Sequence, residues 1–310
     1  MSYPNYIKGI KRMPSNSIVT ENKFNTADEL FDTLVNLFSK DGGNYNAIFR
    51  GVSDARHYLI PSALRCDTFL WCGDMWCKSS GLNNLGQIEA EIMTLAEFSR
   101  IVDKAGMHLS VSISGLILEY FLKLRREYHE TNTYHSWPPE ELLPLLGLAQ
   151  HYGIPTRLLD WSENPLKAAY FSVCKVKTEV EKVAIWALTG LGLQQFPTLW
   201  KAAGRSLLTL VKAPYADNPN LHAQQGIHTI YRTELFDLQT EPDRRPLDIL
   251  LSGISGNNVL RILKFTLPAS EASSLLRLLA KWNISAATLF PGYKGCADAF
   301  HEQRHWTSSE

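Results

Sequence analysis

Residues able to carry acid–base or ionic chemistry gather in one stretch, LAQHYGIPTRLLDWSENPLKAAYFSV, which runs from Leu148 to Val173. His151 is a candidate general base because an imidazole titrates near neutral pH, although a single histidine in a helix–turn is more often structural. Arg157 and Asp160 lie three positions apart, on one face if the stretch is helical, so they could form a simple salt bridge. The stretch is therefore either an active site or a buried polar network that joins two helices.

An arginine stands near the end of a second motif, AIFRG, which spans Ala47–Gly51 and is typical of a short apolar strand followed by a turn. The planar guanidinium of Arg50 suits bidentate recognition of a phosphate or a carboxylate, and Gly51 would let a ligand approach the backbone. The alternative is that Arg50 pairs with a buried aspartate of the same protein, for which Asp160 is a candidate.

Two adjacent glutamines, Gln224 and Gln225, precede a predicted strand in the motif AQQGIHTIY. Their amides could orient a carboxamide, a ribose or a base edge, because each side chain both donates and accepts hydrogen bonds. They could equally satisfy backbone groups of a neighbouring loop.

The elements that must position these residues alternate between helix and strand. Thr26 and Glu29 have the capping-box spacing at the start of a helix, and a second helix ends at Gly153. SENPLKAAYFSVCKV predicts a third helix, with Ser162 as its candidate N-cap and with free backbone N–H groups that could hold an anion. Strands are predicted in YNAIFRG, KVAIWALTG, GIHTIYR and LRILKFTLP.

This pattern predicts an α+β fold: a single domain with a small mixed or antiparallel sheet and a helical insertion. Residues 1–25 are predicted to form an irregular N-terminal arm. Residues 26–305 are predicted to form the domain, with the insertion at about 84–145, which could be a partner surface.

Composition excludes several classes of function. The 310 residues carry a formal net charge of zero, so no general attraction to nucleic acid or to an anionic membrane is expected. The sequence has no apolar run long enough to cross a membrane and no apolar core of a secretion signal, which predicts a cytoplasmic protein. Cys66, Cys72 and Cys77 lack the tight pairing of most zinc sites, so free thiols in a reducing compartment are expected and no metal is. P-loop and GxSxG motifs are absent.

Taken in order, the motifs resemble the FRG domain family of bacteria and phages, named for its Phe-Arg-Gly motif. Phe49, Arg50 and Gly51 match that motif, and YLIPSALR resembles the Pro-Ser-Leu-Arg element that follows it. LAQHYGIPTRLLDWSENPLKAAYFS is similar to the family's longest signature, and AQQG and LFPGYKG also fall in the family's order. The resemblance covers roughly residues 25–300.

A more distant resemblance links the strand ending in aromatic-Arg-Gly to the first motif of ADP-ribosyltransferases, in which the arginine grips the diphosphate of NAD. It implies an ADP-ribosyltransferase-like fold with NAD as substrate. The residues it implicates in NAD binding are Arg50, Gly51, Tyr152, Thr156, Arg157, Trp161 and Gln224, with Trp161 or Tyr152 stacking on a ring. The residues it implicates in catalysis are His151, Asp160 and Gln225.

The sequence departs from ADP-ribosyltransferases at their third motif, where those enzymes commonly place a catalytic glutamate and this chain has Gln224 and Gln225. An amide can bind the ribose but stabilises a developing positive charge poorly, so Asp160 or Glu163 would have to supply the carboxylate.

Three hypotheses follow. The first is an NAD-consuming ADP-ribosyltransferase-like enzyme, a toxin or phage-defence effector with a protein or nucleic-acid target and a possible cognate antitoxin. The second is a non-catalytic module that binds a nucleotide, another phosphorylated ligand or a protein. The third is a purely structural polar network in the core.

Overall fold

The computed structural model describes residues 18–307 apart from 40–46, most of 108–136, 191–197, 203–204, 213–218, 233–238 and 253–259. The second half of the predicted insertion therefore lies largely outside the described residues. The described residues confirm the α+β class. Among them, no helix has the length and apolar character that crossing a bilayer requires.

A mixed sheet runs through the molecule, and the described residues give it eight strands in the order β1-β10-β6-β2-β5-β9-β8-β7. β1 lies parallel to β10, and the other neighbouring pairs are antiparallel. A separate hairpin, β3 with β4, packs against α2. The strands are β1 Val19–Lys23, β2 Ala47–Val52, β3 Phe69–Trp71, β4 Trp76–Lys78, β5 Leu158–Ser162, β6 Lys182–Gly190, β7 Thr198–Ala202, β8 Arg205–Val211, β9 Gly226–Tyr231 and β10 Leu260–Pro268.

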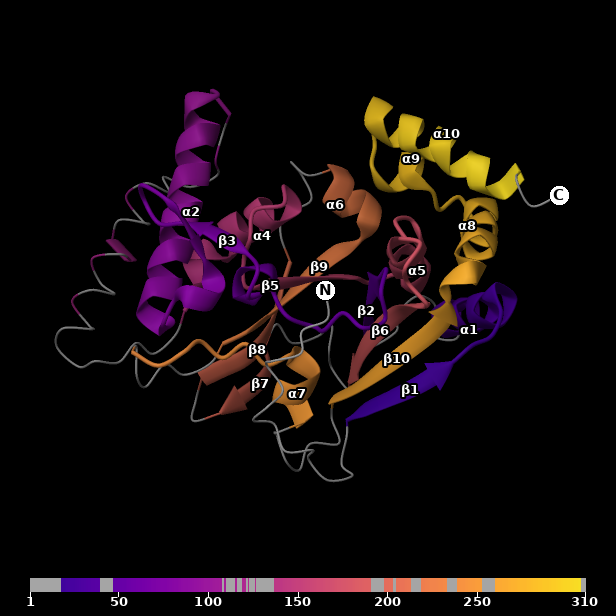
Figure 1. The fold of residues 1–310 in the computed structure, drawn as a ribbon, viewed down its shortest axis with the longest axis horizontal. Helices are drawn as coiled ribbons and strands as arrows, with labels where there is room; N and C mark the ends of the chain where they lie inside the picture. The colour runs from indigo at the N-terminus through magenta and orange to yellow at the C-terminus, as the bar shows by residue number, and fades with distance from the viewer. Residues whose placement is uncertain are drawn as a thin grey trace.

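Two groups of helices cover one face of the sheet, and Figure 1 shows them at opposite ends of the molecule, α2 with α4 and α5 with α8, α9 and α10. α6 lies between the groups, and α7 lies on the other side of the sheet. The helices are α1 Ala27–Ser39, α2 Asn84–Lys104, α4 Leu143–His151, α5 Pro165–Val173, α6 Pro219–Gln224, α7 Leu247–Ser252, α8 Ala272–Lys281, α9 Ala286–Leu289 and α10 Tyr293–Thr307, with 3-10 turns η1 Ser62–Leu64, η2 Ser79–Gly81, η3 Glu140–Leu142 and η4 Ala269–Glu271.

The two helical groups form separate cores on the same face. Phe49 belongs to the core under α1, α5 and α8, and Leu158 belongs to the core under α2 and α4. Phe49 is the direct cross-strand neighbour of Ser162, whose side chain shares a face with that of Leu158, so both cores lie on one side of the sheet. A third core, with Ile48, Trp161 and Leu247, lies on the opposite side.

Most of the predicted elements are confirmed. α1 begins after Thr26, whose hydroxyl accepts a hydrogen bond from the backbone N–H of Glu29 at 3.4 Å. Pro61 precedes the short η1 turn, and the helix before Gly153 ends as predicted, with Gly153 at a φ of 80°. Of the irregular arm predicted for residues 1–25, residues 1–17 lie outside the described residues, and Val19–Lys23 differs from the prediction because it pairs with β10 as an edge strand.

One correction concerns the central motif. The sequence predicts that IPTRLLDW connects two helices, whereas Leu158–Ser162 forms strand β5. The helix that follows is capped by Asn164, whose side chain accepts from Leu166 N–H, and not by Ser162. The strand escaped sequence analysis because a short apolar run has no period that separates strand from helix.

The cysteines give a second correction. Free thiols were expected at Cys72 and Cys77, but these two residues form a disulfide across the β3–β4 hairpin, with their Cα atoms 6.1 Å apart. Cys66, Cys174 and Cys296 are free.

Candidate functional site

The site lies where β2 and β5 separate. The two strands share a single register pair, Phe49 with Ser162, in the described residues. Beyond that pair the Arg50 guanidinium bridges the strands, because its Nη1 donates to the Asp160 carbonyl oxygen at 2.6 Å and lies 3.7 Å from the carboxylate Oδ2. The Arg50 side chain thus links the two strands where their backbones no longer pair.

The three residues of the Phe-Arg-Gly motif do three different things. Phe49 is buried in the core under α5. Gly51 lies directly under α5, and a Cβ at this position would stand 2.0 Å from the carbonyl oxygen of Ala168. A helix backbone, not a ligand, therefore requires this glycine, and only Arg50 is left for a functional role.

Asp160 presents a carboxylate at the junction between the two helical groups. Its Oδ1 lies 3.1 Å from Nδ1 of His228, which is its direct cross-strand neighbour on β9, and its Oδ2 accepts from Gln150 Nε2 at 2.9 Å. The Asp160 side chain is still 50% exposed. It is therefore held by three elements, α4, β2 and β9, while part of it stays open to solvent.

The electrostatics keep this carboxylate ionised. Burial of the group alone would raise the pKa of Asp160, but the hydrogen bond from His228, the charges of Arg50 and His228, and the hydrogen bond from Gln150 outweigh it and lower the pKa to about 2. Burial lowers the pKa of Arg50, Asp160 raises it, and the charge of nearby Arg65 lowers it again. The charge of Arg65 thus reaches the Arg50 guanidinium.

A second layer fixes Gln150, which sequence analysis did not single out. Its Oε1 accepts from the Thr156 hydroxyl at 2.7 Å, so its Nε2 must point at Asp160. The Ser62 hydroxyl accepts from Thr156 N–H at 3.0 Å and donates to Thr156 O at 3.2 Å. Thr156, predicted to touch NAD, is buried and acts on the site through Gln150.

Arg157 does not join this cluster. Because β5 is a strand, residues 157 and 160 face opposite sides of the sheet, and the predicted Arg157–Asp160 pair is wrong. Arg157 Nε instead donates to Glu91 of α2 at 2.8 Å, with both side chains 5% exposed. Gln87 Nε2 and Trp137 Nε1 also donate to the Glu91 carboxylate.

The predicted aromatic residues separate in the same way. Trp161 is buried in the third core, and its Nε1 donates to the Thr229 hydroxyl at 2.8 Å, so its ring is not presented to the Asp160 side of the sheet. Tyr152 is 60% exposed and meets the His151 ring edge-on, with ring centroids 5.1 Å apart. Burial lowers the pKa of His151, as does His228, and Asp160 raises it, so His151 neighbours the cluster.

Of the two glutamines, Gln224 bonds a backbone group through its side-chain amide, whereas the contact of Gln225 is made by its own backbone carbonyl. Gln224 Nε2 donates to Leu289 O at 3.2 Å. Gln225 is exposed at a φ of 48°, and its carbonyl oxygen accepts from Glu163 N–H at 3.0 Å. Glu163 itself pairs with Lys212 at 2.7 Å. Asp160 is therefore the carboxylate that the structure places beside Arg50.

Four site residues were missed from sequence: Ser62, Arg65, Gln150 and His228. All four lie inside motifs that had been quoted, in YLIPSALR, LAQHYG and QQGIHTIY. For His228 the available signal was alternation along β9, which places His228 on the same face as the apolar Ile230.

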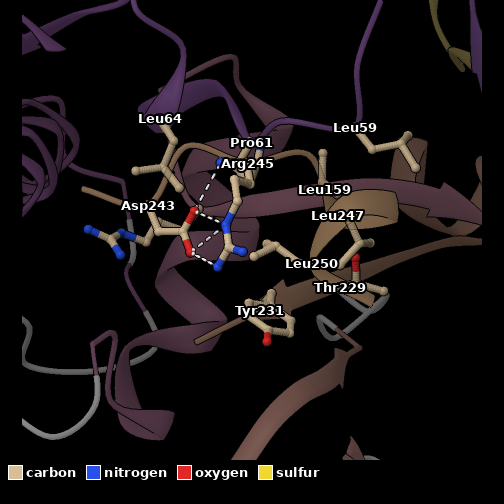
Figure 2. Close-up of a pocket in the computed structure, with 11 residues that line it drawn as sticks. Leu59, Pro61, Leu64, Leu159, Thr229, Tyr231, Asp243, Arg245, Leu247 and Leu250 are labelled. Carbon is tan, nitrogen blue, oxygen red and sulfur yellow. Dashed lines mark hydrogen bonds and ion pairs between the residues drawn. The ribbon is translucent and has the colours of Figure 1, made fainter. Parts of the chain in front are cut away.

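A pocket lies on the opposite side of the sheet and takes its walls partly from Leu159 and Thr229. Its cavity volume is only about 20 Å³, roughly the room that a water molecule needs. Figure 2 shows the Asp243–Arg245 ion pair beside leucine side chains that line it. Neither Arg50 nor Asp160 contributes to its lining.

Comparison with known proteins supports one family. Residues 45–181 match the FRG domain. The match contains the Phe-Arg-Gly motif, the Asp160 strand and α5, and it supports the FRG family for this chain, while His228 lies beyond it. No curated protein and no solved structure matches the chain.

Proposed function

We propose that this FRG-domain protein is an NAD-consuming enzyme of ADP-ribosyltransferase type, acting as a bacterial toxin or anti-phage effector. The observation that carries the proposal is the Asp160 carboxylate, which is ionised, half exposed and held beside Arg50. In this proposal the acceptor is a protein or a nucleic acid, and a cognate partner protein restrains the effector.

The chemistry assigns Asp160 an electrostatic role. Cleavage breaks the bond between the ribose C1′ and the nicotinamide nitrogen, neutral nicotinamide leaves, and positive charge develops on the ribose before a nucleophile attacks C1′. A fixed carboxylate stabilises that charge. A pKa of about 2 suits this role and is unsuited to donating a proton at neutral pH.

The positive side of the site would hold the diphosphate of NAD. Arg50 donates from Nη1 to the carbonyl oxygen of Asp160. Because a guanidinium has five N–H donors in all, further donors remain for a diphosphate. The exposed side chain of Arg65 would add a second cation. The exposed ring of Tyr152 offers a stacking surface for nicotinamide or adenine.

The test is NAD turnover by the wild-type protein and by Asp160→Asn, with a thermal melt of each. Asparagine keeps the size of the side chain and removes its charge. The matched control is Glu97→Gln, which removes the charge of an exposed pair with Arg100 on α2. We expect the wild type and the control to consume NAD, and Asp160→Asn to lose about 10²–10³-fold in kcat with a similar melting temperature.

The absence of a carboxylate at the glutamine pair favours a second function, a non-catalytic nucleotide-binding module. Saturable NAD or ADP binding without NAD loss by the wild type would select this module and overturn the enzyme. Equal turnover by wild type and Asp160→Asn would remove Asp160 from the mechanism.

A further inference from the structure

The Asp160–His228 pair has an unusual distribution of exposure. The Asp160 side chain is 50% exposed, whereas the His228 side chain is 3% exposed. In a Ser-His-Asp triad the order is the reverse, because the buried aspartate orients an imidazole that reacts. The accessible partner is the one that can meet a substrate, so here the histidine serves the carboxylate.

We propose that His228 is a positioning residue, which donates from Nδ1 to Oδ1 of Asp160 and holds the carboxylate in its reactive orientation. This inference rests on the proposed function, since it gives the Asp160 carboxylate the role described above. Gln150 holds Oδ2 from the other side, so the plane of the carboxylate is set by two donors from two elements. A carboxylate with both oxygens held needs no reorganisation when charge develops opposite it.

The geometry identifies the nitrogen that matters. An ionised carboxylate only accepts hydrogen bonds, so the proton shared by the pair lies on Nδ1. Nε2 is shielded from solvent and has no hydrogen-bond partner in the part of the chain that the structure describes. His228 can therefore act on the site through Nδ1 alone.

Two elements, β2 and α4, bring charged or titratable groups to the pair. The charge of Arg50, on β2, lowers the pKa of Asp160. On α4, the pKa of His151 is raised by Asp160 and lowered by His228. Arg65 acts on Arg50. These groups stay in place when His228 is replaced, so a change in the titration of Asp160 reports on the His228 hydrogen bond.

Two substitutions of His228 separate positioning from packing. The amide nitrogen of asparagine stands as many bonds from Cβ as Nδ1 does, and that of glutamine stands as far as Nε2. His228→Asn can therefore still donate to Asp160, whereas His228→Gln offers its donor at the wrong place. Both replace the buried ring by a smaller polar group, so a purely packing role would make them alike.

The first readout is the pKa of the Asp160 carboxyl, followed by carbon-13 NMR as the pH is lowered. We expect His228→Gln to move the pKa of Asp160 from about 2 toward its ordinary value of 3.8, a gain in proton affinity of about tenfold or more. His228→Asn should stay near the wild-type value. Equal titration of Asp160 in the wild type and in His228→Gln would overturn the inference.

The second readout is the acid limb of kcat/KM for NAD, which should move to higher pH in His228→Gln and be rescued in His228→Asn. The NMR titration needs no substrate. A shifted pKa without NAD turnover in any variant would therefore support the positioning of Asp160 and overturn the proposed enzyme. If His228→Gln does not fold, nitrogen-15 NMR of the wild-type imidazole decides, and an unprotonated Nδ1 at neutral pH would overturn the inference.

Discussion

Two arginine–carboxylate pairs involve the region of strand β5: Asp160 lies in the strand, and Arg157 directly precedes it. The two pairs differ in burial and in the spacing of their charges. Arg157 and Glu91 are both 5% exposed, and two further donors complete the carboxylate. Arg50 and Asp160 are 17% and 50% exposed, and their charged atoms stay 3.7 Å apart. The first pair is closed to solvent, although Nη2 of Arg157 is buried without a hydrogen-bond partner among the described residues, whereas the second pair keeps an accessible carboxylate.

This difference decides between the two interpretations of the stretch Leu148–Val173, an active site or a buried polar network. The stretch holds both a structural network and a candidate site, on opposite faces of one strand. Alternation along β5 separates them, because side chains an odd number of positions apart face opposite sides.

The largest expected loss of stability comes from breaking the buried Arg157–Glu91 pair. Glu91→Ala leaves the Arg157 charge buried without a partner, so we expect the free energy of unfolding to fall by about 3–5 kcal/mol. Glu97→Ala on the same helix is the control, because its exposed pair with Arg100 is screened by solvent and contributes little to stability. Urea unfolding of both variants measures the difference. Equal losses in the two variants would show that the Arg157–Glu91 pair is not structural.

Arg50→Ala should have an intermediate effect on stability. It removes a charge-assisted hydrogen bond to the Asp160 carbonyl, which predicts a loss of about 1.5–3 kcal/mol. If Arg50 also binds the diphosphate, NAD turnover falls in a protein that still melts cooperatively. Thermal melts and NAD assays should be run on the same samples. A loss as large as that of Glu91→Ala would make Arg50 part of the core framework and erase the contrast between the two pairs.

Sequence analysis predicted the elements with strong local signals. Thr26 and Glu29 marked the start of α1, Gly153 marked the end of α4, and unbroken apolar residues marked β6. These features depend on neighbours along the chain. Arg50, His151 and Asp160 were also predicted as site candidates, because their residue types stand out in an apolar context.

The partners of those residues could not be predicted, because they depend on strand register. Glu91 meets Arg157, and His228 meets Asp160, across 66 and 68 positions of the chain. The single error over β5 reversed the assignment of Arg157, because strand alternation places Arg157 and Asp160 on opposite faces where a helix would place them on one. Gly51 was likewise interpreted as a ligand contact, since the approach of α5 is invisible without the fold.

The Arg50–Asp160 pair should also make the free energy of unfolding depend on pH. The pKa of Asp160 is lowered from 3.8 in the unfolded chain to about 2 in the folded one, so its contribution is present above pH 4 and is lost as the pH falls toward 2. Because the side chain is half exposed, solvent screening reduces this contribution to about 1 kcal/mol. Urea unfolding at pH 5, 4 and 3 should show a steeper loss in wild type than in Asp160→Asn. Parallel slopes would mean that Asp160 is not held as the structure indicates.

The smallest expected effect concerns Glu163, the other carboxylate that could have served the site. Its pair with Lys212 is partly exposed, at 24% and 54%, so Glu163→Gln should change the free energy of unfolding by only about 0.2–1 kcal/mol. NAD turnover should stay near wild type, because the carboxylate beside Arg50 belongs to Asp160. Parallel NAD assays of Glu163→Gln and Asp160→Asn compare the two carboxylates directly. If Glu163→Gln is inactive and Asp160→Asn is active, the catalytic charge lies beside α6 and Gln225, and the His228 pair is a structural support on the same strand face.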